Sequence, residues 1–123
     1  PEKMMNPRLK MAQVLQEAQQ NKAQVWEDFA IPTEWLNRYP RELSGGELQR
    51  FAIARALAPG VQFVIADEIT TMLDAISQAQ IWQLLNKQIE DRHLGLLLIT
   101  HDNNLAQRVC HESYSFFDLQ KKE

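Results

Sequence analysis

The hydrophobic pattern in the first third of the chain predicts short helices. Apolar residues recur at helical spacing between positions 9 and 18, and Asn6-Pro7 before them supply an N-cap and a proline at the first helical position. Between positions 25 and 36 the apolar residues surround Pro32-Thr33, a pattern typical of short helical turns that pack on one another. Tyr39-Pro40 is expected to end this all-helical part.

The rest of the chain alternates between helical and strand patterns. Apolar residues spaced three or four positions apart indicate helices, whereas short continuous apolar runs indicate buried strands. The elements predicted in this way are a helix over residues 48–57, a strand over 61–66, a helix from Asp74, a strand over 94–100, a short helix over 105–110 and a final strand over 114–119.

A crossover connection relates the two central strands. A strand, a helix and a second strand, with roughly a dozen or more residues between the strands, form a right-handed unit in which the strands run parallel. Asp67-Glu68 closes the first strand, and His101 closes the second. Because the carboxyl ends of parallel strands share one edge, Glu68 and His101, 33 positions apart, are expected to converge where open α/β sheets bind ligands.

Composition narrows the classes of protein that these elements can build. The 123 residues are 45% hydrophobic and 24% charged, which is ordinary for one globular domain and excludes a disordered chain. A net charge of −3 disfavours a nucleic-acid binder that neutralises phosphates. The single cysteine, Cys110, cannot form an internal disulfide, which fits a reducing compartment. The three tryptophans are not interleaved with Lys or Arg and are interpreted as core residues.

Glycine placement excludes one phosphate-binding motif and indicates another. The chain has four glycines, and none precedes Lys-Ser or Lys-Thr, so a P-loop is absent. At Ser44-Gly45-Gly46-Glu47 a capping box opens a helix, and the glycines let a ligand approach the bare amides at its positive end. Such an end binds phosphate, and a plain helix cap is the alternative interpretation.

The two strand ends carry candidate catalytic groups. Asp67 and Glu68 are adjacent, so their carboxylates diverge, and one can hold a hydrated magnesium while the other orients or deprotonates water. His101 can donate a hydrogen bond to a developing phosphoryl charge. Solvated carboxylates and a structural histidine are the alternatives. His93 and His111 lack companions at metal-ligand spacing and are interpreted as surface residues.

Four motifs, taken together, resemble those of the ABC-type ATPases. They are Leu43-Ser44-Gly45-Gly46-Glu47-Leu48-Gln49-Arg50, similar to the signature motif, Phe63-Val64-Ile65-Ala66-Asp67-Glu68, similar to the Walker B strand, Leu73-Asp74, similar to the D-loop, and Ile99-Thr100-His101-Asp102, similar to the switch-histidine loop. Two further segments, Arg38-Tyr39-Pro40 and Gln78-Ala79-Gln80-Ile81, resemble the nucleotide-binding subunits of peptide and nickel importers.

The resemblance implies a role for each residue that matches a family motif. Ser44 and Gly46 are expected to contact the γ-phosphate of ATP held on a partner subunit, with Gly45, Glu47 and Gln49 shaping that helix end. The remaining roles are magnesium binding through water for Asp67, catalytic base for Glu68, γ-phosphate switch for His101 and a contact across the dimer for Asp74.

The resemblance also implies a fold and a set of partners. The expected fold class is α/β, a partial P-loop NTPase fold in which residues 1–43 form a helical subdomain and 44–123 a parallel-strand, RecA-like half. The implied function is ATP hydrolysis, with Mg²⁺, that drives the import of a peptide or nickel. The implied partners are a second nucleotide-binding subunit and transmembrane permease subunits, at the cytoplasmic face of the cell membrane.

Departures from the family pattern modify these expectations. Ile69 stands where the family usually has proline, and Met72 where it usually has a small residue. The Walker A loop and the Q-loop glutamine are expected to precede Pro1, so the isolated chain is expected to be inactive. Without the Walker A strand, unpaired strand edges favour self-association.

Two other functions stay open. The run from Leu43 to Ala54 also resembles the ribosome-recycling ATPases, and chromosome-maintenance ATPases separate their Walker A and signature lobes, so a soluble ATPase acting on ribosomes or DNA is one alternative. The acidic balance and the lack of coiled-coil heptads disfavour it. A non-catalytic fragment, stable only as a dimer or domain-swapped assembly, is the other.

Overall fold

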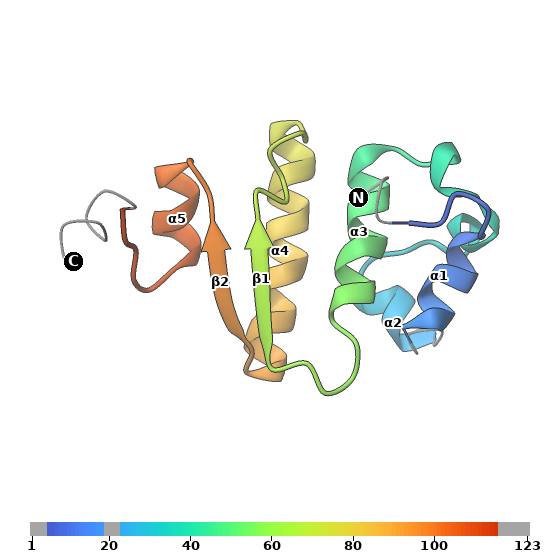
Figure 1. The fold of residues 1–123 in the computed structure, drawn as a ribbon, viewed down its shortest axis with the longest axis horizontal. Coiled ribbons are helices and arrows are strands. Elements are labelled where there is room, and N and C mark those ends of the chain that lie inside the picture. Colours follow the sequence, from blue (N-terminus) through green and yellow to red (C-terminus); the bar gives the residue numbers. More distant parts are fainter. Residues whose placement is uncertain (1–4, 19–22, 116–123) are drawn as a thin grey trace.

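Short helices form the first part of the chain, and helices alternating with strands form the rest (Figure 1). The computed structural model describes residues 5–18 and 23–115. The elements are α1 (Met11–Glu17), α2 (Ala23–Asp28), the 3-10 helices η2 (Thr33–Asn37) and η3 (Pro40–Glu42), α3 (Gly45–Ala56), β1 (Phe63–Asp67), α4 (Ala75–Arg92), β2 (Gly95–Ile99) and α5 (Asn103–Val109). The predicted order of elements is confirmed as far as α5.

The first helix begins later than the Asn6-Pro7 pattern predicts. Asn6 Oδ1 accepts a hydrogen bond from the backbone N–H of Arg8 at 3.0 Å, so this side chain caps a separate turn. The N-cap of α1 is Lys10, whose backbone N–H donates to Gln13 Oε1 at 2.9 Å. The predicted helix start is wrong because asparagine side chains close turns as readily as they cap helices.

Short turns connect α2 to α3. The prediction of short helical turns between positions 25 and 36 is confirmed by α2 and η2, but the prediction that Tyr39-Pro40 ends them is wrong. Pro40 instead opens η3, since proline at a first helical position has no N–H to leave unpaired. Glu42 Oε2 accepts from the backbone N–H of Tyr39 at 2.8 Å, and this bond holds the turn that delivers the chain to α3.

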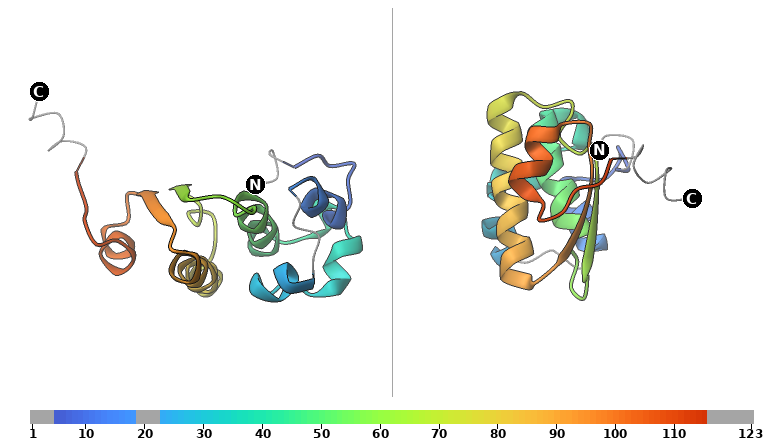
Figure 2. Two further views of the ribbon diagram at one scale, coloured as in Figure 1. Left: turned by 90° about the horizontal axis from the view of Figure 1, so that it is seen from below. Right: turned by 90° about the vertical axis from the view of Figure 1, so that its left-hand side faces the viewer.

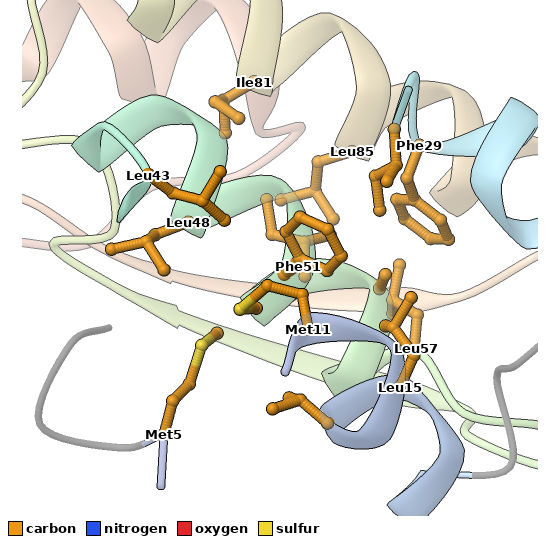
Figure 3. Packing of buried hydrophobic residues seen from close by; sticks show 14 of the residues in the cluster. Met5, Met11, Leu15, Phe29, Leu43, Leu48, Phe51, Leu57, Ile81 and Leu85 are labelled. Atoms are coloured by element: carbon orange, nitrogen blue, oxygen red, sulfur yellow. The ribbon is translucent and has the colours of Figure 1, made fainter. Parts of the chain in front are cut away.

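One hydrophobic cluster joins the helices of both predicted parts (Figure 3). Met11 of α1, Phe51 of α3 and Leu85 of α4 are each no more than 1% exposed. The interpretation of the tryptophans as core residues is confirmed, because this cluster contains the buried Trp82 and, packed against it, the partly buried Trp26 and Trp35. The predicted division at residues 43 and 44 stays a prediction.

The two strands form a parallel sheet, as the crossover pattern predicts. Phe63 pairs with Gly95 at one end of the register, and Asp67 pairs with Ile99 at the other. The ring of Phe63 lies over Gly95 so closely that a Cβ there would meet Phe63 Cδ1 at 2.5 Å. Glycine therefore allows the pair to form at the start of the sheet.

Only one face of this sheet is covered within the described chain. Figure 2 shows α4 and α5 on the same side of the strands. The prediction of buried strands is wrong for the other face, where alternate residues are exposed, namely Phe63 (77%), Ile65 (68%), Leu97 (58%) and Ile99 (46%). We call these four residues the open sheet face. Its apolar character follows from strand sequences that are apolar at successive positions rather than alternately.

The predictions for the two ends of the chain lie partly outside the described residues. The final strand was expected over residues 114–119, but Tyr114 and Ser115 are not in a strand, and 116–119 lie outside the described residues. The importer-like opening, 1–4, also lies outside them. Among the residues that are described, no helix combines the length and the apolar character needed to cross a bilayer.

Candidate functional site

The predicted site residues lie at one end of the molecule. The carboxyl ends of β1 and β2 and the amino ends of α3, α4 and α5 all lie at the upper end in Figure 1. This arrangement follows from the parallel crossover, because each strand runs toward that end and the following helix runs back. Two groups of residues occur there, one at the strand ends and one at the start of α3.

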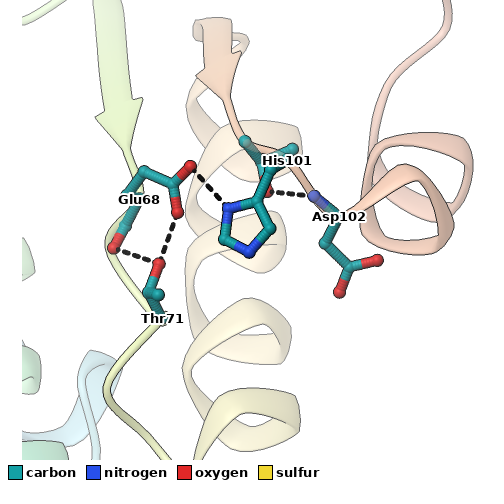
Figure 4. A network of polar contacts seen from close by, with 5 residues as sticks. Glu68, Thr71, His101 and Asp102 are labelled. Atoms are coloured by element: carbon teal, nitrogen blue, oxygen red, sulfur yellow. Dashed lines mark hydrogen bonds and ion pairs between the residues drawn. The ribbon is translucent and has the colours of Figure 1, made fainter.

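The first group centres on Glu68 and His101, which the structure brings into direct contact. His101 Nδ1 lies 2.9 Å from Glu68 Oε1, although the two residues are 33 positions apart (Figure 4). The convergence predicted from the strand ends is therefore confirmed. Because Nδ1 faces a carboxylate, the ring carries its proton on Nδ1 when neutral and on both nitrogens when charged.

The backbone at Glu68 turns sharply out of the sheet. Its φ of 51° lies in the left-handed region, which a residue with a Cβ adopts at a cost in conformational energy. Its backbone N–H donates to the carbonyl of Ile99 at 3.0 Å, so the neighbouring strand holds it in place. Strained backbone of this kind, held by the surrounding structure, is concentrated at functional sites.

The pair is electrostatically coupled although it is exposed. The Thr71 hydroxyl, and after it the His101 ring, hold the pKa of the Glu68 carboxyl below its ordinary value. In return, the hydrogen bond and the charge of Glu68 raise the pKa of His101. The ionised carboxylate and the protonated imidazole therefore favour each other, a state suited to accepting one proton and to donating hydrogen bonds.

Thr71 is a member of this group that sequence analysis missed. Its Oγ1 lies 2.6 Å from Glu68 Oε2 and 3.0 Å from the Glu68 carbonyl oxygen (Figure 4). The signal that could have found it is a hydroxyl three residues after a strand-end carboxylate, the spacing of a hydrogen-bonded turn. That signal is weak without knowing that Glu68 adopts a left-handed conformation.

Asp67 ends β1, and its side chain is exposed. Among the residues described, no cluster of three or more His, Cys, Asp or Glu could hold a metal ion. Magnesium does not need such a cluster, since it usually keeps several waters and takes one or two carboxylates together with phosphate oxygens. A single exposed carboxylate at a sheet edge therefore fits magnesium held through water. The role itself stays a prediction.

The second group is the amino end of α3. Ser44 is the N-cap, and the predicted capping box is present: Ser44 N–H donates to Glu47 Oε2 at 2.9 Å, and Glu47 N–H donates to Ser44 Oγ at 3.3 Å. Glu47 therefore shapes this helix end from within the chain. Ser44 and Gly45 are exposed, which leaves the start of the helix open to a ligand.

The two glycines are not required by the packing of the described chain. A Cβ on Gly45 would lie 3.5 Å from Leu73, and one on Gly46 would lie 3.5 Å from Ser77, both ordinary contact distances. Neither glycine has a positive φ, unlike Gly60. A molecule that approaches this helix end from outside the chain therefore explains the two glycines better than packing does.

Gln49 and Asp74 occupy positions with local structural roles. Gln49 is only 7% exposed, so it faces the interior of the helical part. Asp74 caps α4, because its carboxylate accepts from the backbone N–H of Ser77 at 2.8 Å and from the Ser77 hydroxyl at 3.1 Å. These bonds lower the pKa of Asp74. Its contact across a dimer stays a prediction, as does the shaping role of Gln49.

A small cavity adjoins the strand-end group. Its volume is about 130 Å³, and the residues that line it include Glu68, Thr71, His101 and, from α4, Trp82. Drug-sized ligands occupy roughly 300–1,000 Å³, so this cavity is too small for a nucleotide. It has room for a few water molecules, each of which takes about 30 Å³ in the liquid.

Comparison with known proteins identifies a family. A family model described as "ABC transporter" matches residues 2–71, more than half of the chain. Among solved structures, the dimeric structure of MJ0796, a bacterial ABC transporter cassette, matches with a TM-score of 0.67 and 29% identity over 84% of this chain and 50% of that one. The same cassette, in a post-hydrolysis state bound to ADP and Pi, matches equally.

The curated relatives are named as ATP-binding proteins of import or transport. The chain is 47% identical over 77 residues to the nickel import ATP-binding protein NikD of Brucella abortus, covering 63% of this chain and 29% of that protein. It is 38% identical over 100 residues to the oligopeptide transport ATP-binding protein OppF of Bacillus subtilis, covering 81% and 33%. It is 35% identical over 125 residues to the uncharacterized ABC transporter ATP-binding protein YejF of Escherichia coli, covering 91% and 24%. The chain thus spans a third or less of the length of these relatives.

Proposed function

The chain belongs to the ABC transporter family of ATP-binding proteins, and we propose that it supplies the signature helix and the hydrolytic strand ends of an ATPase that drives solute import. The observation that carries this proposal is the contact of 2.9 Å between Glu68 and His101, next to Asp67 at the sheet edge. A base, a proton-bearing imidazole and a carboxylate for magnesium at one edge are what hydrolysis of a phosphoanhydride requires.

Glu68 acts as the general base in this proposal. As a carboxylate it can accept a proton from a water molecule that attacks phosphorus, and its left-handed backbone turns it out at the sheet edge. The small adjacent cavity has room for such a water. Glu68 raises the pKa of His101, which favours the charged ring, and in that form the N–H on Nε2 can donate to an oxygen of the terminal phosphate.

The amino end of α3 acts on the nucleotide of a second subunit. Ser44, Gly45 and Gly46 expose the positive end of a helix and approach phosphate there without steric hindrance. Asp67 holds magnesium through water, and magnesium neutralises charge on the phosphates when bound. Because one copy offers a helix end and the other a base, two cassettes are needed for each complete site.

The names of the relatives support a proposal about the transported solute. NikD is a nickel import protein and OppF an oligopeptide transport protein, and methionine import protein MetN of Xanthomonas oryzae is 46% identical over 77 residues. We therefore propose import of nickel or a peptide, with membrane permease subunits at the cytoplasmic face. In this proposal the helices described within residues 1–43 contact those subunits.

The test is phosphate release from ATP. Because the chain contains no P-loop, we place it in the MJ0796 cassette, exchanging the matching half of that cassette for this chain, and call the product the cassette chimera. The proposal predicts ATP-dependent phosphate release that Glu68→Gln lowers by about 100-fold or more, since general-base catalysis typically contributes 10²–10⁴-fold. Glu112→Gln, an exposed carboxylate change beyond α5, is the matched control and should leave the rate unchanged.

Two results would count against the proposal. One is a folded cassette chimera, verified by circular dichroism, that releases no phosphate above background. The other is equal activity in the Glu68→Gln and parent proteins.

A further inference from the structure

The Thr71 hydroxyl lies closest to the proposed base. Its Oγ1 is 2.6 Å from Glu68 Oε2, within the range of about 2.5–2.7 Å expected when a hydroxyl donates to a carboxylate. It is 3.0 Å from the Glu68 carbonyl oxygen. A hydroxyl has one proton to donate, so the shorter, charge-assisted bond to the side chain takes it.

The turn does not depend on this hydroxyl. The backbone N–H of Thr71 already donates to the Glu68 carbonyl at 3.3 Å, which closes the turn without any side chain. Thr71 is exposed, so burial gives no reason for a hydroxyl at this position. The neighbouring Thr70 differs, because it is 3% exposed and accepts a hydrogen bond from Trp82 Nε1 at 3.1 Å.

We infer that Thr71 is a positioning residue that holds Glu68 Oε2 and so leaves Glu68 Oε1 as the oxygen that accepts the proton of the attacking water. This inference rests on the proposed function of Glu68. Each oxygen of the carboxylate has one partner, Thr71 on Oε2 and His101 on Oε1 (Figure 4). Each carboxylate oxygen has more than one acceptor site, so Oε1 accepts from water beside its bond with His101, and Thr71 keeps the carboxylate from rotating.

In the hydrolytic step, water attacks the terminal phosphorus of ATP and Glu68 accepts one proton. Glu68 Oε1 takes the proton of water as the water oxygen bonds to phosphorus, and the leaving ADP oxygen departs with the electron pair of the broken bond. Thr71 donates its hydrogen bond throughout and exchanges no proton. It therefore acts on the position of the base and does not take part in the reaction itself.

The test compares the isosteric change Thr71→Val with the conservative change Thr71→Ser in the cassette chimera. Valine keeps the shape and loses the hydroxyl, whereas serine keeps the hydroxyl. We expect Thr71→Val to lower kcat about 10- to 100-fold with KM for ATP unchanged, because a misplaced reacting group costs up to about 100-fold in rate. Thr71→Ser should stay within about threefold of the parent, and Thr71→Val should have no further effect in a Glu68→Gln protein.

A second measurement does not depend on hydrolysis. In this chain alone, side-chain NMR couplings of Glu68 should report one dominant rotamer in the parent and in Thr71→Ser, and averaged rotamers in Thr71→Val. Averaging in the parent, or one rotamer in all three proteins, would overturn the positioning role. If the parent chimera hydrolyses ATP and the Thr71→Val chimera does so at the same rate, the positioning role is also wrong. The proposed function would not be affected by that result. If the folded parent chimera does not hydrolyse ATP, the proposed function itself is contradicted.

Discussion

At the scale of single residues, the strand-end group is a set of mutually dependent charges on the surface. His101 is 77% exposed and Glu68 37%, so solvent and salt screen the pair, and its contribution to folding is small. The main effect of the pair is on the pKa values of its two side chains. Each group favours the charged form of the other, which lowers the pKa of Glu68 and raises the pKa of His101.

Removing the charge of Glu68 should lower the pKa of His101. Glu68 raises that pKa above the ordinary value of 6.5, so Glu68→Gln should return it toward 6.5 or below. An NMR titration of the ring protons in this chain measures it, with His93 as the internal reference. The charged pair stabilises the folded state at pH values between the ordinary pKa of Glu68, 4.5, and that of His101, 6.5. This stabilisation is lost as pH rises through the raised pKa of His101 or falls through the lowered pKa of Glu68. An unchanged titration of His101 would contradict the contact.

Neighbouring threonines should respond differently to loss of the hydroxyl. Thr70→Val leaves the buried Trp82 Nε1 without its acceptor, so it should lower the free energy of unfolding by about 1–3 kcal/mol. Thr71→Val, on the surface, should change it by about 0.5 kcal/mol or less. Urea unfolding of both variants gives the comparison. Equal losses would mean that the Thr70 contact does not form.

At the scale of elements, the amino end of α3 contains two features with different roles: a capping box that stabilises the helix, and two glycines that the helix itself does not need. Its capping box is satisfied within the chain, and its glycines meet nothing closer than 3.5 Å when a Cβ is added. A helix that only needed a cap would gain from alanine at these positions, since glycine is less favourable in helices by about 0.5–1 kcal/mol. Their presence fits the close approach of a phosphate.

Gly46→Ala should therefore leave folding intact and reduce catalysis. In the cassette chimera we expect an unchanged or slightly raised Tm and phosphate release lowered about 10-fold or more, because a methyl group would stand where phosphate meets the helix amides. Gly60→Ala is the matched control with the opposite expectation: its φ of 88° strains any side chain, so Tm falls while the rate per folded molecule holds. Equal rates in Gly46→Ala and parent would refute this use of the helix end.

The elements also show which features sequence patterns could predict. The helix cap at Ser44, the start of a helix near Asp74 and the parallel pairing of the strands are local or topological, and they were predicted. The start of α1 was not, because Asn6 satisfies a turn instead. Thr71 was missed because its role depends on the left-handed backbone at Glu68, which no local residue preference reveals.

At the scale of the whole molecule, the open sheet face distinguishes this chain from a self-sufficient domain. Both strands belong to a sheet of only two strands within the described residues, and the four residues of that face are 46–77% exposed. Exposed apolar faces next to unpaired strand edges promote association. Self-association is what the alternative of a non-catalytic fragment, stable only as a dimer or domain-swapped assembly, leads us to expect.

Light scattering over a range of concentrations tests this property. We expect the apparent mass of the parent chain to rise with concentration and that of the double variant Ile65→Thr and Leu97→Thr to stay monomeric, because threonine keeps strand propensity and removes apolar surface. Met72→Thr removes a 95% exposed apolar side chain outside this face and should behave as the parent. A parent chain that is monomeric at every concentration would exclude association through the open sheet face.

The most direct test of the account is a crystal structure of the cassette chimera with Mg²⁺ and a non-hydrolysable ATP analogue. The account predicts a dimer in which Glu68 and His101 of one copy face the terminal phosphate of the nucleotide that this copy binds. Ser44 and Gly46 of the other copy should contact the same phosphate. A nucleotide bound away from the strand ends, or a dimer whose α3 amino ends meet no phosphate, would contradict it.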